Sequence, residues 1–303
     1  MNHIELNETR CAICNTTDNA TELYPANFDI SHFNSEIFSA RRIPDRIHYR
    51  MVKCNGCGLV RSDPIADAVT IGKLYRESSF DYGAEVNSLR RTYGHYLDKL
   101  ESFSVSKGSL LEIGCGNGFF LEEAQARGYQ DVRGVEPSSS AVDQASPTIR
   151  KQIVCDMMRP GLFAKETFDV VCMFQVFDHI SNPTALLHEC VTALKSGGLV
   201  LILNHNIKSL SSLILRERSP IIDIEHTYLY SPDTLAKIVE KAGLKVMCSC
   251  SVLNEYPIQY IMRLVPFPSP IKNLMLWILK KSRLGRFPLS VPLGNLCLVA
   301  QKL

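Results

Sequence analysis

The sequence predicts an α/β protein built on a parallel sheet that helices cover on both faces. Three observations predict this organisation. Short apolar runs alternate with helical stretches from Ser109 onward, as in chains that form parallel sheets. A glycine-rich turn lies within LLEIGCGNGFF, residues 110–120. Two C-x-x-C pairs lie in residues 1–62, ahead of this alternation, and predict a separate small unit.

The composition of the 303-residue chain is that of a packed globular protein, with 46% hydrophobic and 21% charged residues. A formal net charge of only +2 argues against a nucleic-acid partner. The amino terminus is polar and has no signal-peptide core. The sequence has no uninterrupted run of 18 apolar residues, so no transmembrane helix is expected. Eleven cysteines without a secretory signal fit reduced thiols, so we expect a cytoplasmic protein.

Three regions are predicted along the chain. Residues 1–62 carry the cysteine pairs and little regular periodicity, and are expected to form a zinc-binding domain. Residues 63–107 are expected to form a helical connector or lid, in which Asp67 caps one helix and a second helix runs from Glu85 to Phe103. The main α/β domain covers residues 108–303.

The main domain is predicted to alternate strands and helices up to an insertion at residues 256–292, which interrupts the pattern between the last two strands. Helices are expected near Leu121, near Ala141, over 183–194 and over 233–242, the last with Pro232 at its start and Gly243 just past its end. Strands are expected at 110–113, 131–135, 152–155, 169–174, 199–203, 245–249 and 296–300.

The glycine-rich turn predicts a ligand site. A buried strand ends at Ile113, and the following glycines let a ligand lie against the main chain and the N–H groups of the next helix. Glu136 lies twenty residues after Gly116, at the end of the next strand, where a carboxylate can accept both hydroxyls of a ribose. The dinucleotide pattern G-x-G-x-x-G/A is not met, because Phe119 stands at its last position.

From residue 107 to about 250 the chain resembles the class I S-adenosylmethionine (SAM)-dependent methyltransferases. The resemblance rests on LLEIGCGNG, GVEP, Cys155-Asp156-Met157, FDVVCMFQVFDHISNP and LLHECVTALKSGGLVLI in this order. It implies a Rossmann-like seven-stranded methyltransferase sheet whose last strand is antiparallel, with SAM as methyl donor. The alternative is a nucleotide-binding or non-catalytic domain of the same fold.

The resemblance also implies which residues hold SAM. The glycine turn would surround the methionine part of SAM, and Glu136 would hold the ribose. Asp156 would accept a hydrogen bond from the adenine amine, while Phe174 and Gln175 would close the pocket. The implied set is Glu112, Gly114, Cys115, Gly116, Gly118, Glu136, Pro137, Asp156, Met157, Phe174 and Gln175.

The two cysteine pairs predict a zinc site. Cys11 and Cys14 form one C-x-x-C pair, and Cys54 and Cys57 form the other after a gap of 39 residues, longer than in compact zinc ribbons. Four thiolates can close a tetrahedral zinc site, and such a site has no open position, so its metal would be structural. Two buried reduced pairs, or a redox-active pair, are the alternatives.

The cysteine pairs and the motif CGLVRSDP, followed by a tyrosine-containing helix, resemble bacterial zinc-containing sugar methyltransferases. This resemblance implies a small-molecule acceptor, a nucleotide-linked sugar or a glycan, and it suggests that Tyr75 and Tyr82 form a lid over the acceptor. Two alternatives stay open. One is an O-methyltransferase of a quinone or other small aromatic, and the other is a non-catalytic SAM-binding zinc protein.

Histidines are the expected bases for methyl transfer, because imidazole exchanges protons near neutral pH. In the sugar C-methyltransferases a Glu-His pair, with the histidine as base, occupies the place of Glu225-His226. Asp223 stands where those enzymes have a tyrosine, so the choice between C- and O-methylation stays open. His179 is a second catalytic candidate, and His205 follows the fifth strand. The alternative for His226 is a packed histidine that stabilises its own loop.

Residues 270–287, PIKNLMLWILKKSRLGRF, are predicted to form a basic amphipathic segment. Leu274, Trp277, Ile278 and Lys281 share one incomplete helical face, and further lysines and arginines gather at the end of the segment. A helix of this kind can lie on an anionic membrane. Packing on the protein core or on a second subunit are the alternatives.

Overall fold

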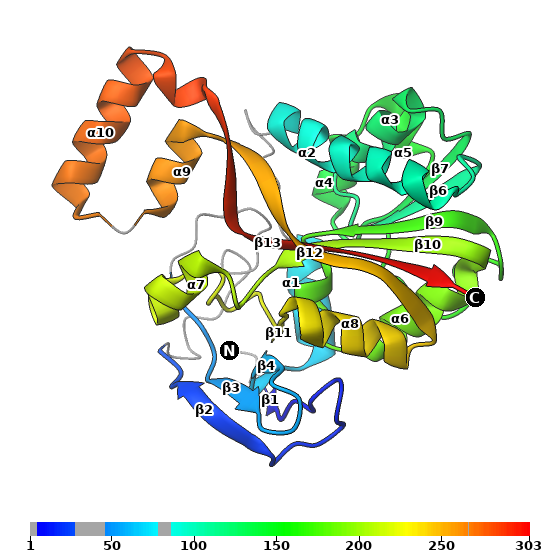
Figure 1. The fold of residues 1–303 in the computed structure, drawn as a ribbon, viewed down its shortest axis with the longest axis horizontal. Coiled ribbons are helices and arrows are strands. Elements are labelled where there is room, and N and C mark those ends of the chain that lie inside the picture. The colour runs from blue at the N-terminus through cyan, green and yellow to red at the C-terminus, as the bar shows by residue number, and fades with distance from the viewer. Residues whose placement is uncertain (1–4, 28–45, 78–85, 266) are drawn as a thin grey trace.

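The structure, a computed structural model, describes residues 5–27, 46–77, 86–265 and 267–303. Its centre is a seven-stranded sheet with the order β12-β13-β10-β9-β6-β7-β8 (Figure 1). The α/β fold predicted from the sequence is confirmed. The strands of this sheet are β6 (Ser109–Ile113), β7 (Asp131–Val135), β8 (Ile153–Val154), β9 (Phe168–Phe174), β10 (Leu194–His205), β12 (Leu244–Pro257) and β13 (Pro288–Lys302).

The strand directions in the main sheet bring several turns to one edge. β8, β7, β6, β9 and β10 run parallel to one another, and β13 runs antiparallel to both of its neighbours, β10 and β12. The reversed last strand is the one that the resemblance implied. Because parallel strands end at the same edge, the turns after β6, β7, β9 and β10 meet there, where open α/β sheets bind their ligands.

Helices cover both faces of the main sheet (Figure 1). Alternate residues of β9 belong to two separate cores, with Val170 and Cys172 packed toward α2 and α3, and Val171 and Met173 packed toward α6 and α8. The helices before the insertion are α1 (Ala68–Glu77), α2 (Val86–Asp98), α3 (Phe119–Ala126), α4 (Ser139–Asp143), α5 (Pro147–Arg150), α6 (Pro183–Ala193), α7 (Leu210–Leu215) and α8 (Pro232–Lys241).

The connector between the cysteine pairs and the main sheet is helical, as expected. Asp67 caps α1, because its carboxylate accepts two backbone N–H groups of the first turn at 2.9 and 3.0 Å. The second helix is shorter than predicted, since α2 ends at Asp98 and continues as a 3-10 helix (Lys99–Phe103). Its predicted start, Glu85, lies outside the described residues. Tyr93 of α2 is a packing residue, 2% exposed and stacked on Phe174 with ring centroids 4.2 Å apart.

The predicted insertion at residues 256–292 is smaller than expected. β12 and β13 stay paired until Pro257 lies opposite Pro288, so the two strands extend beyond the sheet as a ribbon. In the described part of the segment between them lie α9 (Ile258–Leu264), α10 (Ser269–Lys281) and a 3-10 turn (Leu284–Arg286). Among the described helices, none has both the length and the apolar character needed to cross a bilayer.

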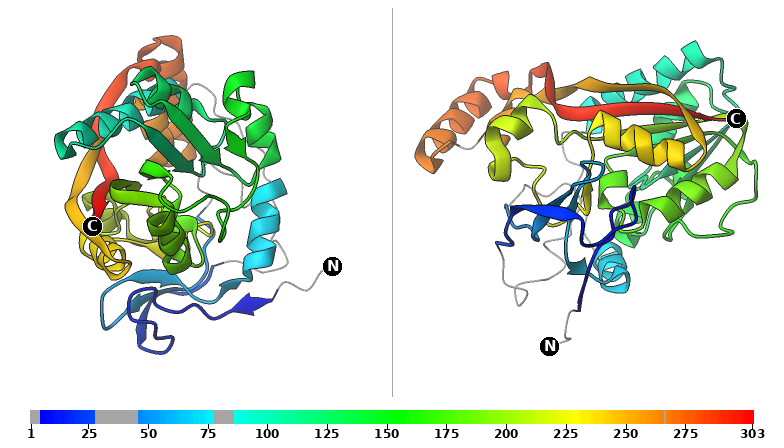
Figure 2. Two further views of the ribbon diagram at one scale, coloured as in Figure 1. Left: turned by 90° about the vertical axis from the view of Figure 1, so that its right-hand side faces the viewer. Right: turned by 60° about the horizontal axis from the view of Figure 1, so that its bottom comes forward.

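A second sheet joins the amino-terminal region to the main domain. Its strand order is β11-β4-β3-β2, and a short pair, β1 with β5, lies beside it (Figure 2). Strand β11 belongs to the segment after the main sheet's fifth strand, yet it pairs with β4. The sequence analysis predicted no strands before residue 62. The strands are β1 (Leu6–Asn7), β2 (Ala20–Tyr24), β3 (Met51–Cys54), β4 (Val60–Ser62), β5 (Ile65–Ala66) and β11 (Tyr228–Leu229).

Candidate functional site

A cavity of about 1100 Å³ lies where the parallel strands end. One part of it is lined by Gly114, the first residue of the glycine turn after β6, and by the acidic residues Glu136 and Asp156. Another part is lined by His179, His205 and His226. Most of the predicted cofactor residues and the predicted catalytic residues therefore border one continuous space.

The glycine turn has the backbone that the sequence predicted. Gly114, Gly116 and Gly118 all have positive φ angles, +72°, +55° and +73°, which side chains other than glycine adopt only with strain. A Cβ added at Gly114 would collide with the side chain of Val176. The turn therefore requires glycine both for its backbone conformation and for space beside the cavity.

The carboxylate of Glu136 forms a hydrogen bond with the backbone of the glycine turn. Its two carboxylate oxygens accept the backbone N–H groups of Gly116 and Ser138, both at 2.9 Å. Burial raises the pKa of Glu136, and these two N–H groups act in the opposite direction. The carboxylate is thus oriented by the backbone at the end of β7, where a ribose would lie.

The remaining cofactor candidates divide into two groups. Asp156 accepts the N–H of Met157 at 2.7 Å and the Nε–H of Arg159 at 2.9 Å, and these bonds lower its pKa. Cys115 is buried, and burial raises the pKa of its thiol. The structure places Gly114, Glu136, Pro137, Asp156, Met157, Phe174 and Gln175 in the cavity wall. The wall does not include Glu112, Cys115, Gly116 or Gly118, which lie in β6 and within the turn.

Gly114→Ala is expected to weaken SAM binding about 5- to 150-fold, since a strained backbone position costs about 1–3 kcal/mol and the new methyl group would collide with Val176, which lines the cavity. Isothermal titration would measure the affinity. Gly197→Ala is the matched control, because Gly197 has a similar φ of +77° but no neighbouring atom within 4 Å. Equal losses in both variants would show that the turn has no special role.

A cluster of three histidines surrounds the buried carboxylate of Asp178. Its Oδ2 atom lies 2.6 Å from Nδ1 of His205, a hydrogen bond, and 3.9 Å from Nε2 of His226. Its Oδ1 atom lies 3.7 Å from Nε2 of His179. The rings of His179 and His205 flank that of His226, with centroid distances of 4.7 and 4.8 Å. The turn after β9, the last residue of β10 and the loop after α7 thus meet at one carboxylate.

Two predicted residues stand around this cluster. Tyr75 of α1 was predicted to be part of a lid. Its hydroxyl oxygen lies 2.9 Å from Nδ1 of His179, within hydrogen-bond distance. The other predicted lid residue, Tyr82, lies outside the described residues. Glu225 is buried, and burial together with the charge of Glu225 raises the pKa of Tyr75. The Glu225-His226 pair therefore does lie at the cavity, with the tyrosine of α1 facing it.

The electrostatics of the cluster favour a neutral His226 and an ionised Asp178. Burial acts to raise the pKa of Asp178, but the nearby His205 outweighs it, together with the other two histidines, and the pKa falls well below its ordinary value. Burial and the neighbouring His179 lower the pKa of His226 well below 6.5. At neutral pH the buried ring of His226 is therefore uncharged.

The free energy of unfolding is expected to fall by up to about 1.4 kcal/mol per pH unit below about pH 6.5 on account of His226. In that window the unfolded chain binds a proton at this histidine while the folded chain does not, so acid favours unfolding. Urea unfolding at pH 5, 6, 7 and 8 would measure the slope. A His226→Gln variant should lose the part of the pH dependence that comes from His226. An unchanged slope in this variant would contradict a buried, neutral ring.

Sequence reasoning missed the centre of the cluster. Asp178 was not among the predicted site residues, and His205 was only placed near the site. A topological signal existed, because β9 and β10 are parallel neighbours, Asp178 follows the carboxyl end of β9, and His205 is the last residue of β10. Asp178 is not part of the cavity wall, and it acts there through the histidines that it contacts.

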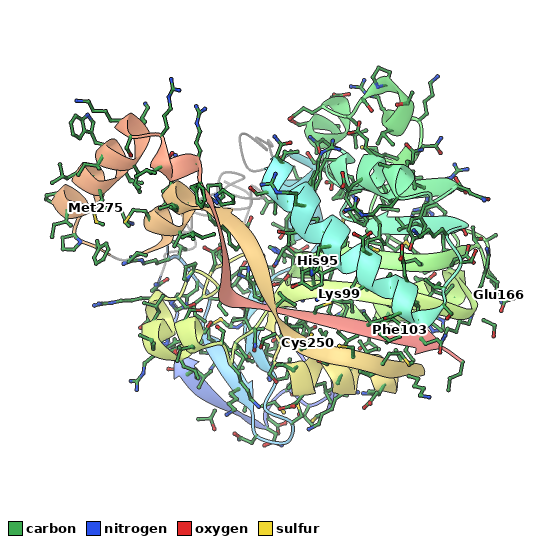
Figure 3. All side chains as sticks on the ribbon, turned by 45° about the horizontal axis from the view of Figure 1, so that its top comes forward. His95, Lys99, Phe103, Glu166, Cys250 and Met275 are labelled. Atoms are coloured by element: carbon green, nitrogen blue, oxygen red, sulfur yellow. The ribbon has the colours of Figure 1, made fainter. Side chains whose placement is uncertain are left out.

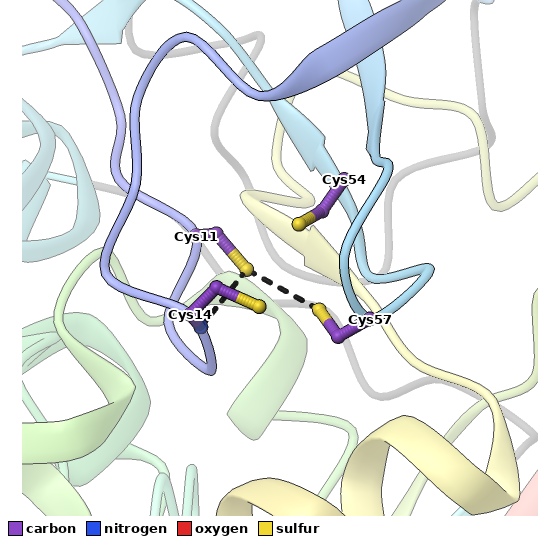
Figure 4. A group of neighbouring side chains, drawn as sticks. All are labelled: Cys11, Cys14, Cys54 and Cys57. Carbon is purple, nitrogen blue, oxygen red and sulfur yellow. Dashed lines mark hydrogen bonds between the residues drawn. The ribbon is translucent and has the colours of Figure 1, made fainter.

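The four predicted metal ligands lie together (Figure 4). The Sγ atoms of Cys11, Cys14, Cys54 and Cys57 all lie within 4.8 Å of one another, and those of Cys11 and Cys57 are 3.4 Å apart. Four thiolates about 2.3 Å from one zinc ion would be spaced by similar distances. Burial acts to raise the pKa of Cys54, but backbone N–H groups of Cys57 and Gly56 help to lower it to about 7. The donor set thus fits a zinc ion.

The cysteine cluster is connected to the His226 loop. Ser62, at the end of β4, donates its hydroxyl to the backbone carbonyl of His226 at 2.8 Å, and its N–H to that of Thr227 at 2.9 Å. The hydroxyl of Tyr228 donates to the carbonyl of Arg10, next to Cys11, at 2.8 Å. The amino-terminal sheet therefore holds the backbone of the loop that carries His226.

A seven-stranded sheet with a reversed last strand, a glycine turn, and an acidic residue at the end of the next strand define a SAM-dependent methyltransferase. Residues 87–249, more than half of the chain, match the methyltransferase domain family. The chain belongs to this family and is an enzyme of this class.

Several known proteins are similar to the chain. Ubiquinone biosynthesis O-methyltransferases from Stutzerimonas stutzeri and Cereibacter sphaeroides are 29% and 33% identical over 150 and 151 residues. These matches cover 46% and 45% of this chain, and 61% and 59% of the relatives, so the chain spans about three fifths of their length. A chain of the Haloferax volcanii complex between the Trm112 methyltransferase activator and a methyltransferase has the same fold. Its TM-score is 0.50 at 16% identity, over 73% of this chain and 94% of that one.

Proposed function

We propose that this methyltransferase transfers the methyl group of SAM to a hydroxyl group on a small, largely apolar acceptor such as a phenol or quinone precursor. The observation that carries the proposal is the single cavity that joins the SAM-binding turn to the histidine cluster. A cavity of this size accommodates the donor together with a second small molecule.

The wall of the cavity beyond the histidines supports an apolar acceptor. It includes Leu215, Ile221, Tyr260, Ile261 and Val265, together with polar residues such as Ser219 and Asn295. An aromatic ring with one reacting hydroxyl suits such a wall, because the ring can contact the apolar side chains while the hydroxyl faces the imidazoles.

The similar proteins from Stutzerimonas stutzeri and Cereibacter sphaeroides are O-methyltransferases by name, which supports O-methylation. The sugar acceptor predicted from the sequence has no counterpart among these names, so the aromatic alternative is the better supported of the two.

The chain's own residues would position the acceptor and remove its proton. SAM, when bound, supplies the electrophilic methyl carbon to the acceptor oxygen and leaves as S-adenosylhomocysteine. We assign the base to His205, because its Nδ1 is fixed by Asp178 and the other ring nitrogen remains to accept a proton. The proton of the acceptor hydroxyl moves to that nitrogen and then to solvent. Asp178 is a positioning residue that stabilises the protonated ring.

His205→Gln is expected to lower the turnover number by about 10²–10⁴-fold, the usual cost of losing a general base. His226→Gln should have a smaller effect, since its ring is 6% exposed and has a lowered pKa, which makes it a weak base. Steady-state kinetics of both variants would rank them. If His226→Gln is the more damaged variant, then His226 is the base, as the sequence analysis predicted.

An acceptor panel tests the proposed function. Purified protein, SAM and a set of catechols, hydroxylated quinones and nucleotide-linked sugars would be incubated in parallel, and release of S-adenosylhomocysteine measured. Turnover with the aromatic hydroxyl compounds is expected. Turnover with the nucleotide-linked sugars alone would overturn the proposal and restore the sugar prediction.

The proposal includes one structural zinc ion on Cys11, Cys14, Cys54 and Cys57. Their thiolates would fill all four positions of a tetrahedral site, so the ion would hold the amino-terminal unit, residues 1–62, and take no part in methyl transfer. Its contribution to the reaction would be indirect, through the bonds from Ser62 to the His226 loop.

A further inference from the structure

The outer face of α10 carries a stripe of exposed apolar side chains. Ile271, Leu274, Trp277 and Ile278 are spaced by three or four residues along the helix and are between 48% and 58% exposed. α10 packs mainly against α9 and the 3-10 turn that follows, and no side chain of α10 is fully buried. Figure 3 shows the helix that carries Met275 standing apart from the main sheet. Packing on the protein core, one alternative from the sequence analysis, is therefore wrong.

The charge around this stripe has one sign. From Tyr256 to the end of the chain there are seven lysines and arginines and no aspartate or glutamate. Lys281 lies over the ring of Trp277, with Nζ 4.9 Å from the ring centroid. An isologous contact with a second copy would bring these positive charges together, which is unfavourable. The charge pattern suits an anionic surface.

A second exposed apolar helix lies at the same end of the molecule (Figures 1 and 2). Leu210, Leu213 and Ile214 of α7 are 60–72% exposed, and Arg216 and Arg218 follow them directly. Isolated apolar side chains are common on protein surfaces, whereas here two helices at one end of the molecule each expose several leucines or isoleucines.

The same elements line the acceptor part of the cavity. Leu215 belongs to α7, Tyr256 to β12, and Tyr260 and Ile261 to α9, and all four border the cavity. The exposed apolar surface is therefore the outer side of the segments whose inner side faces the space assigned to the acceptor.

We propose that α7, α9 and α10 form a docking surface for a bilayer that contains anionic lipids. The stripe of α10 and the leucines of α7 would enter the headgroup boundary, and the lysines and arginines would lie against lipid phosphates. An amphiphilic acceptor could then pass from the bilayer to the cavity through the neighbouring segments. This last step rests on the proposed function, whereas the docking itself does not.

Vesicle co-sedimentation of the full-length protein, without any acceptor, tests the docking. The protein should bind vesicles of phosphatidylcholine with phosphatidylglycerol and bind pure phosphatidylcholine weakly. Lys280→Gln with Lys281→Gln should lower the partition coefficient about 25-fold, at about 1 kcal/mol per basic residue near the surface. Leu274→Ser with Trp277→Ser should lower it as well. Val69→Ser, which alters a residue 80% exposed on α1, should leave it unchanged.

Three results would overturn the docking proposal. These are no binding to anionic vesicles, equal losses in the α10 and α1 variants, or a concentration-dependent dimer that the α10 substitutions abolish in sedimentation velocity. The last result would assign the stripe to a second copy of the chain. Turnover of a water-soluble phenol separates the two proposals, because it requires the proposed function and no membrane. Vesicle binding without any phenol turnover would leave the docking and refute the O-methylation.

Discussion

Asp178→Asn is expected to lower the rate of methyl transfer by about 10²–10⁴-fold, while the affinity for SAM stays close to that of the unchanged protein. The carboxylate is fully buried and forms a 2.6 Å hydrogen bond to His205, with two more histidines within 4 Å. An amide of the same shape removes the negative charge that stabilises a protonated imidazole. Single-turnover kinetics and isothermal titration would separate the two effects.

The pH dependence distinguishes this role from a merely structural one. In Asp178→Asn the acidic limb of the rate profile should move, because a protonated ring is no longer stabilised by an adjacent anion. Asp131→Asn is the control, since the side chain of Asp131 is about half exposed, pairs with Arg133 at 3.0 Å and does not line the cavity. A uniform drop in rate with an unshifted profile would show that Asp178 only supports the fold.

Cys14→Ser is expected to abolish zinc binding and to lower both the stability and the activity of the enzyme. Structural zinc sites contribute directly to folding, so loss of the metal should remove several kcal/mol from the amino-terminal unit. The activity should fall too, because the sheet beside the cysteines bonds to the backbone of His226 and Thr227 through Ser62. Metal analysis, thermal unfolding and turnover would be measured on the same samples.

Cys250→Ser provides the matched control for this prediction. Cys14 and Cys250 are both exposed, so removing either sulfur costs little through burial alone, but only Cys14 lies in the four-cysteine cluster. The expected contents are about one zinc per chain in the control and close to none in Cys14→Ser. Equal stability of both variants would mean that the four thiols do not hold a structural metal.

The main sheet could be predicted from the sequence because its signals are local. The strand before Gly114 has Leu110, Leu111 and Ile113 between two glycines, and the strand before Glu136 ends just ahead of Pro137. Each has the predicted position to within a residue. The last two strands were predicted too short. Their pairing continues to Pro257 and Pro288. The prolines of this segment favoured an early end of both strands, but a two-stranded ribbon tolerates proline at its edges.

The parts that could not be predicted depend on contacts between distant segments. Strand β11 is only two residues long, and its partner β4 lies more than 160 residues earlier, so no local pattern marks the pair. The same is true of Asp178 and His205, which are 27 residues apart and meet only because β9 and β10 are neighbours in the sheet. The residue types of a local motif were sufficient to predict the glycine turn. The histidine cluster could be found only from the order of strands in the sheet.

The destination of the methyl group tests the central claim most directly. Protein, SAM labelled with ¹³C in its methyl group, and a catechol or hydroxylated quinone would be incubated, and the product examined by ¹³C NMR. We expect one new methyl resonance in the range of methyl ethers, with an equal amount of S-adenosylhomocysteine, and its loss in His205→Gln. A methyl resonance bound to carbon, or full labelling by His205→Gln, would contradict O-methylation by the histidine cluster.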